Sequence, residues 1–143
     1  MKYIFPTLIT AAAIAGCAGH TTNVQQVKMA EGKKLEKVCV VTNYSIQDSV
    51  EAAINNAVAA KGILSIPVNS LEMAKNMKCN AYIMYGGTYE SDGGSFLSSL
   101  RIEVFINDQL AGRANASVPN NLTLSKYSAG EKVIPELINQ LFP

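Results

Sequence analysis

The N-terminal segment limits how much of this chain can contribute to a fold. Lys2 provides a positive start, and residues 3–14 are apolar apart from two threonines. A membrane-spanning helix needs about 20 apolar residues, whereas this run is shorter and the chain turns polar directly after Cys17. A positive flank, a short apolar run and small residues at its end are typical of a signal peptide. The sequence therefore predicts that residues 1–16 are removed.

The end of the apolar run carries a signal for lipidation. In Ile14-Ala15-Gly16-Cys17, two small residues let an extended backbone enter a peptidase site, and the cysteine can take a thioether-linked lipid. The motif resembles the lipobox of bacterial lipoproteins, which implies cleavage between Gly16 and Cys17 and lipidation of Cys17. Two or three acyl chains give stable anchoring where one would not. The alternative is an ordinary signal peptide with an incidental cysteine.

The residue after Cys17 indicates the destination. In Gram-negative lipoproteins an aspartate there usually directs retention in the inner membrane, whereas this chain has Ala18. We therefore expect a lipid-anchored protein of the cell outer membrane whose domain faces the periplasm. The expected partners are the membrane, the lipoprotein-processing and sorting machinery, and an envelope protein that the sequence does not identify.

The mature chain is neutral and long enough for one small domain. Removal of residues 1–16 leaves 11 basic and 11 acidic side chains. Nucleic-acid binding asks for a basic excess, so this class of function is excluded. About 125 residues suffice for one hydrophobic core. Residues 17–35 are polar with little periodicity and are assigned to a lipidated tether, and residues 36–143 to a single periplasmic domain.

Two cysteines remain once Cys17 is lipidated. Cys39 and Cys79 would lie in an oxidising compartment, where they allow one intramolecular disulfide. The alternative is two buried thiols that never meet. A metal site is not expected, because the single histidine, His20, lies in the predicted tether and two thiols fall short of four zinc ligands.

The first half of the domain reads as strand, helix, strand. Residues 37–43 are β-branched and apolar in succession, which suits a strand buried on both faces. Apolar residues at helical spacing predict a helix over residues 46–61, followed by a strand over residues 63–68. Pro67 places that second strand at a sheet edge or ends it early. A βαβ unit makes its two strands parallel.

The second half reads as an antiparallel meander and a helix. A short helix over residues 71–77 precedes three predicted strands over residues 81–90, 96–106 and 110–118, and a final helix covers residues 128–142. Pro135 should kink this helix or move its start later. We therefore predict an α+β fold, with one βαβ unit, a meander, about five strands in one sheet and two long helices on one face.

The last hairpin has a predicted register. A three-residue loop pairs Ile106 with Leu110 and keeps the apolar residues on one face, whereas a two-residue loop would place Ile106 opposite Gln109. The same register sets Glu103 opposite Arg113 on the solvent face. We interpret this pair as a surface ion pair worth well under ~1 kcal/mol.

Several short stretches carry a family resemblance. They are Val38–Asn43, Cys79–Tyr85, Phe96–Ser98, Leu124–Tyr127, Lys132–Pro135 and Leu141-Phe142. From Val38 to the C-terminus the chain resembles a family of small uncharacterised lipoproteins of Gram-negative bacteria. The family pattern carries both domain cysteines, which favours the disulfide. It usually has a tryptophan just before Asp92, where this chain has Ser91. The resemblance implies placement and fold but no activity.

Three tyrosines form the only candidate binding patch. Tyr82, Tyr85 and Tyr89 lie on one predicted strand. Core packing is the favoured interpretation, and a binding patch is the alternative, because tyrosine is enriched at interfaces.

The predicted domain lacks the residues of a usual catalytic site. It contains no histidine, which removes the commonest general base. We expect no enzyme activity, no metal and no cofactor. The leading hypothesis is a non-catalytic, lipid-anchored binding or assembly module in the periplasm. The alternatives are a cell-wall-acting enzyme or enzyme inhibitor, and a structural lipoprotein needed for envelope integrity.

Overall fold

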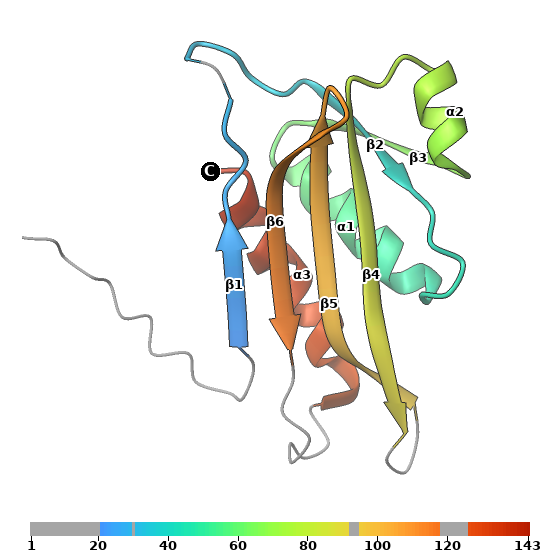
Figure 1. Cartoon of the computed structure of the whole chain (residues 1–143). Helices are drawn as coiled ribbons and strands as arrows, with labels where there is room; N and C mark the ends of the chain where they lie inside the picture. The colour runs from blue at the N-terminus through green and yellow to red at the C-terminus, as the bar shows by residue number, and fades with distance from the viewer. Residues whose placement is uncertain (1–20, 30, 92–94, 118–125) are drawn as a thin grey trace, which may run out of the picture.

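A computed structural model describes residues 21–29, 31–91, 95–117 and 126–143. Its elements in chain order are β1 (Thr21–Gln25), β2 (Lys37–Val41), α1 (Asp48–Ala60), β3 (Leu64–Val68), α2 (Leu71–Asn76), β4 (Ala81–Ser91), β5 (Ser95–Ile106), β6 (Gln109–Ser117) and α3 (Lys126–Leu141). The strands form one mixed sheet in the order β1-β6-β5-β4-β2-β3 (Figure 1).

The predicted fold of five strands with two long helices is wrong. Within the described residues, the sheet has six strands and is covered by three helices, of which α2 has only six residues. The extra strand, β1, comes from residues that the sequence assigns to the tether, and it pairs antiparallel with β6. The pattern missed β1 because only Val24 packs against the core, while the rest of the strand is polar. Main-chain pairing, rather than hydrophobic periodicity, makes this strand.

Strand β2 lies between two strands that run parallel to it. It pairs with β3 on one side and β4 on the other, and the predicted parallel pairing of β2 with β3 is confirmed. Its side chains alternate between two buried clusters, Val38 and Val40 in one, Cys39 and Val41 in the other. Helix α1 packs on the first face and α2 on the second. Strand β3 is an edge strand, as Pro67 predicts.

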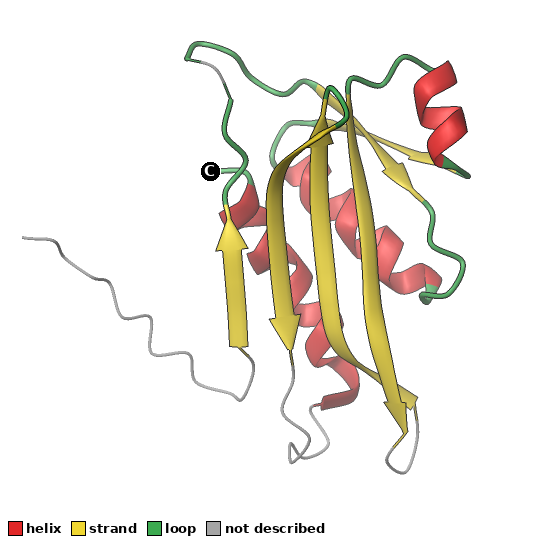
Figure 2. Ribbon diagram, in the orientation of Figure 1, coloured by secondary structure: helices red, strands yellow, loops and turns green. Residues whose placement is uncertain are grey.

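Helices α1 and α3 cover the same face of the sheet (Figure 2). Their buried side chains are Val50, Ile54 and Val58 of α1 and Val133, Ile134, Leu137, Ile138 and Leu141 of α3. Burying one such side chain stabilises the fold by about 1.5–3 kcal/mol. Helix α3 begins before Pro135, so the predicted later start is wrong. Pro135 is exposed, where water can bond the carbonyl that the proline leaves unpaired.

The last hairpin turns on two residues, not on the three predicted. Ile106 lies opposite Gln109, and the turn residues Asn107 and Asp108 both have positive φ, 51° and 63°. Positive φ at both central residues is typical of a type I′ turn, whose twist matches that of the flanking strands, and Asn and Asp tolerate it. As a result Leu110 is 43% exposed instead of lying with the core.

A bulge repairs the register beyond the turn. Val104 pairs with Gly112 and Phe105 with Leu110, which leaves Ala111 as one extra residue in β6. The shift restores the predicted pairing of Glu103 with Arg113. From Val104 and Gly112 onward, away from the turn, β5 and β6 therefore have the register that was predicted for a three-residue loop.

Gly112 allows the chain after β1 to lie close against β6. A Cβ at this position would lie 2.7 Å from Val27 Cγ2 and 3.0 Å from the Val27 nitrogen. Real Cβ atoms essentially never show a contact under 3.0 Å, so a larger residue at this position forces Val27 to shift. The Val27 N–H also donates to the Leu141 carbonyl at 2.9 Å, which ties this segment to the end of α3.

We predict that Gly112→Ala loosens the segment after β1. The added methyl group forces Val27 away from β6, so trypsin should cleave faster after the exposed Lys28, as followed by mass spectrometry. Gly86→Ala is the matched control, because its nearest neighbours would lie at 3.8 and 4.0 Å, an ordinary contact. Equal cleavage rates in both variants would contradict the close packing of this segment.

Candidate functional site on the open face of the sheet

One face of the sheet remains open among the described elements. Helices α1 and α3 cover the other face, and α2 covers the open side only where it packs against β2 and β3. Strands β1, β6, β5 and β4 therefore present one side of their ladder outward. Side chains on this side are largely polar or charged, so it is the natural place to look for a binding site.

Strand register arranges these side chains in rows. Ser117, Ser99 and Thr88 form one row across β6, β5 and β4, at the level of Thr21 in β1; Asn23, Asn115, Arg101 and Gly86 form the next on this face; Gln25, Arg113, Glu103 and Met84 form the third. The first two rows line a groove of about 580 Å³. The groove therefore combines three strands that are consecutive in the chain with β1, which is distant from them in the sequence.

An ion-pair network lies just beyond the groove. Glu103 accepts hydrogen bonds from Arg113 through Nη2 at 2.8 Å and Nε at 3.2 Å, and it forms an ion pair with Arg101, whose Nε lies 3.1 Å from Oε1. The Glu103 side chain is 18% exposed, whereas that of Arg101 is 58% exposed. One carboxylate thus holds two guanidinium groups on the open face. The sequence identified the Glu103–Arg113 pair but not the second arginine.

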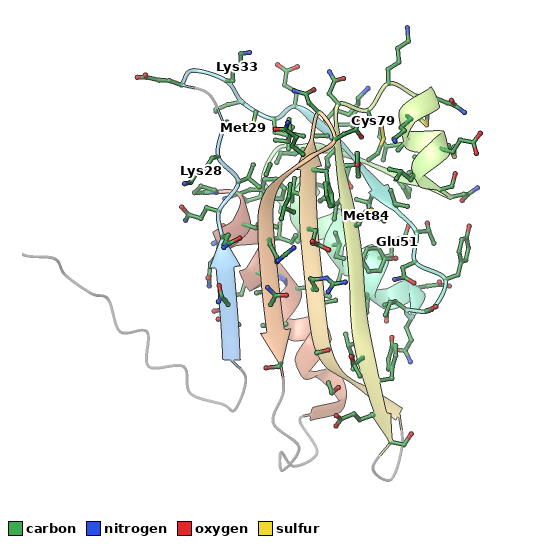
Figure 3. The ribbon with its side chains drawn as sticks, in the orientation of Figure 1. Lys28, Met29, Lys33, Glu51, Cys79 and Met84 are labelled. Carbon is green, nitrogen blue, oxygen red and sulfur yellow. A yellow bond between two sulfur atoms is a disulfide. The ribbon has the colours of Figure 1, made fainter. Side chains whose placement is uncertain are left out.

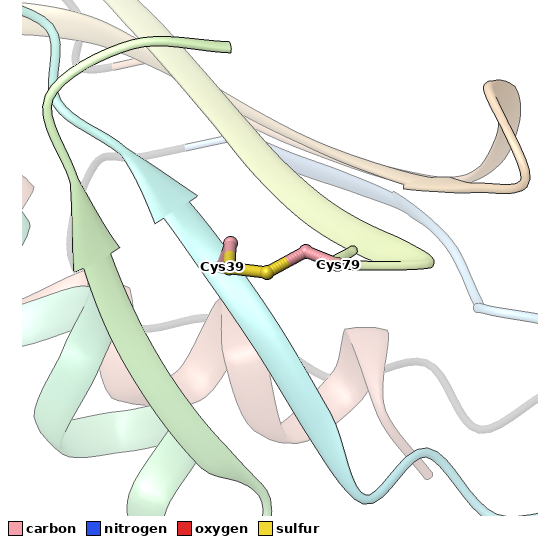
Figure 4. Close-up of a disulfide and its surroundings, with 2 residues drawn as sticks. All are labelled: Cys39 and Cys79. Atoms are coloured by element: carbon pink, nitrogen blue, oxygen red, sulfur yellow. A yellow bond between two sulfur atoms is a disulfide. The ribbon is translucent and has the colours of Figure 1, made fainter. Parts of the chain in front are cut away.

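Cys39 and Cys79 are the two predicted site residues that the structure joins, through a disulfide. Cys39 of β2 and Cys79, just before β4, are bonded with a Cα–Cα distance of 6.1 Å (Figure 4). Both side chains are buried, in a cluster with Ala74 of α2 and Tyr82. The bond closes a loop of 40 residues that contains α1, β3 and α2.

The three tyrosines do not share one surface. Tyr82 packs on the face of the disulfide, whereas Tyr85 and Tyr89 pack on the face covered by α1 and α3. Tyr82 and Tyr85 are each 6% exposed. The Tyr82 ring stacks on Phe105 at 5.2 Å, and its hydroxyl donates to Asp108 at 3.2 Å. Burial, with the neighbouring Asp108 carboxylate, raises the pKa of Tyr82.

Tyr85 holds the loop between β2 and α1 in place through hydrogen bonds. Its hydroxyl donates to Oε2 of Glu51, the α1 residue labelled in Figure 3, at 3.0 Å and accepts from the Asn43 N–H at 3.1 Å. The Asn43 side chain donates to the Tyr85 carbonyl at 2.8 Å, and Thr42 Oγ1 donates to Glu51 at 3.1 Å. Burial raises the pKa of Tyr85 to about 12, and Glu51 acts in the same direction. These hydrogen bonds hold the loop in place, and we refer to them as the loop clamp. The polar groups that form them find their partners within the network.

The clamped loop presents an exposed aromatic ring. Tyr44 follows Asn43 and is 79% exposed, the largest exposed fraction among the described large apolar residues. Tyr89 supports the same loop, because its hydroxyl accepts from the Gln47 N–H at 2.9 Å. The sequence alone does not distinguish Tyr44, since one isolated tyrosine in a loop has no recognisable pattern.

The described residues hold no group of three or more His, Cys, Asp or Glu side chains arranged for a metal ion. Within the same part of the chain, no helix is both long enough and apolar enough to cross a membrane. Gly16 and Cys17, the predicted cleavage and lipidation residues, lie outside the described residues. Lipidation at Cys17 therefore stays a prediction from the sequence.

The comparisons with known proteins give a fold neighbour. No family model matches the sequence, and neither does any curated protein. Among solved structures, the chain is similar to a PelC dodecamer from Paraburkholderia phytofirmans, solved as a single-substitution variant, with a TM-score of 0.60 and 17% identity. The match covers 86% of this chain and 99% of the PelC chain. At this identity the likeness shows a shared fold alone.

Loss of the disulfide should destabilise the domain strongly. Closure of a 40-residue loop restricts the unfolded chain, so Cys39→Ala/Cys79→Ala is expected to lower the free energy of unfolding by about 4 kcal/mol. Urea denaturation with and without reductant measures this. Reductant should shift the wild type toward the variant and leave the variant unchanged. A reductant-insensitive wild type would contradict the prediction.

Tyr85→Phe should weaken the loop clamp. The variant removes one donor and one acceptor from a buried network and is expected to cost about 1–2 kcal/mol in urea denaturation at neutral pH. Tyr89→Phe, whose hydroxyl bond lies at the surface, is the matched control and should cost less.

The effect of Tyr85→Phe should also depend on pH. The pKa of about 12 in the folded protein lies above the ordinary tyrosine value of 10.0, so the stabilisation is complete below pH 10 and is lost as the pH rises through about 12. The stability difference between wild type and variant should therefore shrink over that range. A constant difference would contradict the raised pKa.

Proposed function

We propose that this protein is a lipid-anchored, non-catalytic binding or assembly module of the bacterial cell envelope, with its domain in the periplasm. The observation that carries the proposal is Ile14-Ala15-Gly16-Cys17, placed at the end of a short apolar run. A lipid on Cys17 would fix the domain to a membrane that no described helix could span.

The disulfide supports an envelope location. Structural disulfides form and persist in oxidising compartments such as the bacterial periplasm and are rare in the cytosol. The Cys39–Cys79 bond is buried and closes a long loop, as expected of a structural crosslink.

The polar groups of the domain support a role without catalysis. Among the described residues, every buried side-chain nitrogen or oxygen has a hydrogen-bond partner. Glu51 is held by Tyr85 and Thr42, and Glu103 by two arginines. Such carboxylates are engaged in holding the fold, whereas an acid–base catalyst must reach a substrate.

Assembly with further copies of the chain is the form of the proposal that the fold neighbour favours. The PelC protein of similar fold is a dodecamer. One fold supports many functions, so this likeness contributes a hypothesis about assembly and nothing about a ligand.

Replacement of Cys17 tests the proposal directly. Wild-type protein should give an N-terminal peptide carrying acyl chains by mass spectrometry and should sediment with membranes. Cys17→Ala should remain unlipidated and leave the outer-membrane fraction. In-cell crosslinking of both forms should recover either copies of this chain or one stoichiometric partner, and the yield should fall when the anchor is lost.

Two results would overturn the proposal. An unmodified, soluble wild-type protein would remove the anchor, and catalytic turnover abolished by a single substitution in the purified protein would remove the non-catalytic role.

A further inference from the structure

The link between the lipidation site and the sheet is very short. Cys17 stands four residues before Thr21, the first residue of β1. An extended chain covers at most about 3.6 Å per residue, so this link spans no more than about 14 Å in any conformation. Once Cys17 carries its lipid, the Thr21 end of the sheet is held beside the membrane surface.

The groove on the open face lies at this same end. Thr21 is level with Ser117, Ser99 and Thr88, and the last three line the groove. Figure 1 shows β1 starting at the end of the sheet where β6 finishes, with β4 and β5 extending further in the same direction. The groove therefore opens within reach of the anchoring membrane.

The opposite end of the sheet is well separated from it. Gln109 pairs with Ile106, which stands seven residues along β5 from Ser99. At about 3.4 Å per residue this places the β5–β6 turn about 24 Å from the membrane-side row. The two ends can therefore be told apart by a probe that senses lipid.

The groove has the chemistry of a phosphate site. Its lining combines hydroxyl and amide side chains with Arg101, the single charged residue among those that line it. Arginine has five N–H donors, of which the ion pair with Glu103 uses Nε. With a side chain 58% exposed, the guanidinium can present further donors to an anion, and charge-assisted bonds to phosphate are among the strongest in proteins.

We infer that this groove docks on the phosphate headgroups of the membrane in which Cys17 is anchored, with Arg101 as the main contact. The inference rests on the proposed function, since lipid on Cys17 is what brings the groove to the headgroups. Docking would hold the domain in one orientation, with the Thr21 end toward the lipid and the β5–β6 turn away from it.

A fluorescent label at each end of the sheet tests the orientation. Ser91→Cys and Gln109→Cys each supply one reactive thiol outside the groove, because Cys39 and Cys79 are joined and Cys17 would carry lipid. The labelled, lipidated protein is placed in vesicles of phosphatidylcholine and phosphatidylglycerol that contain headgroup nitroxide quenchers. Quenching should be severalfold stronger at position 91 than at position 109. Equal quenching, or stronger quenching at 109, would overturn the inference.

A second pair of variants tests the contact itself. Arg101→Gln should reduce quenching at position 91, because it removes the main phosphate contact while the anchor stays in place. Arg113→Gln is the matched control, since it removes the same charge from the same face but lies outside the groove, where Glu103 holds it. Equal quenching in Arg101→Gln and the parent would overturn the docking role.

The mass of the N-terminal peptide distinguishes failure of the proposed function from failure of this inference alone. A peptide without lipid overturns the proposed function together with this inference. A lipidated peptide combined with equal quenching at both labelled positions overturns the inference alone.

Discussion

Main-chain pairing between β1 and β6 is the interaction that fixes the position of the N-terminal segment within the sheet. The β1 sequence offers little hydrophobic stabilisation, since Val24 alone packs against the core. Its position is set by a five-residue antiparallel ladder and by the close approach of Val27 to Gly112. The hydrogen bond from Val27 to Leu141 then links it to the last helix. A polar segment close to the predicted lipidation site thereby becomes part of the sheet.

The rest of the fold is organised around β2. This strand is buried on both faces, so it needs cover on both sides, and the chain supplies it with α1 on one face and α2 on the other. The disulfide joins β2 to the start of β4 on the side with the shorter helix, where the hydrophobic cluster is smaller. Four strands beyond this region keep one face open, and the groove lies there.

Hydrophobic periodicity predicted the parts of the fold that it physically determines. The helix expected over residues 46–61 is α1, and the final helix expected over residues 128–142 is α3, with buried apolar side chains from Val133 to Leu141. Strand β1 was missed because an edge strand with polar side chains has no such signal. The Asn107-Asp108 turn was missed because face matching alone cannot anticipate a bulge at Ala111. The groove depends on alignment of four strands, which single segments do not specify.

The proposed position of the groove requires β1 to be an ordered strand, which amide hydrogen exchange measures directly. In the intact chain, a peptide covering residues 21–25 should exchange about as slowly as peptides from β6, because both belong to one hydrogen-bonded ladder. Exchange at the rate of an unstructured linker would contradict the account. In that case residues 17–35 would form a long tether, as the sequence predicts, and the groove on the open face would not be held near the membrane.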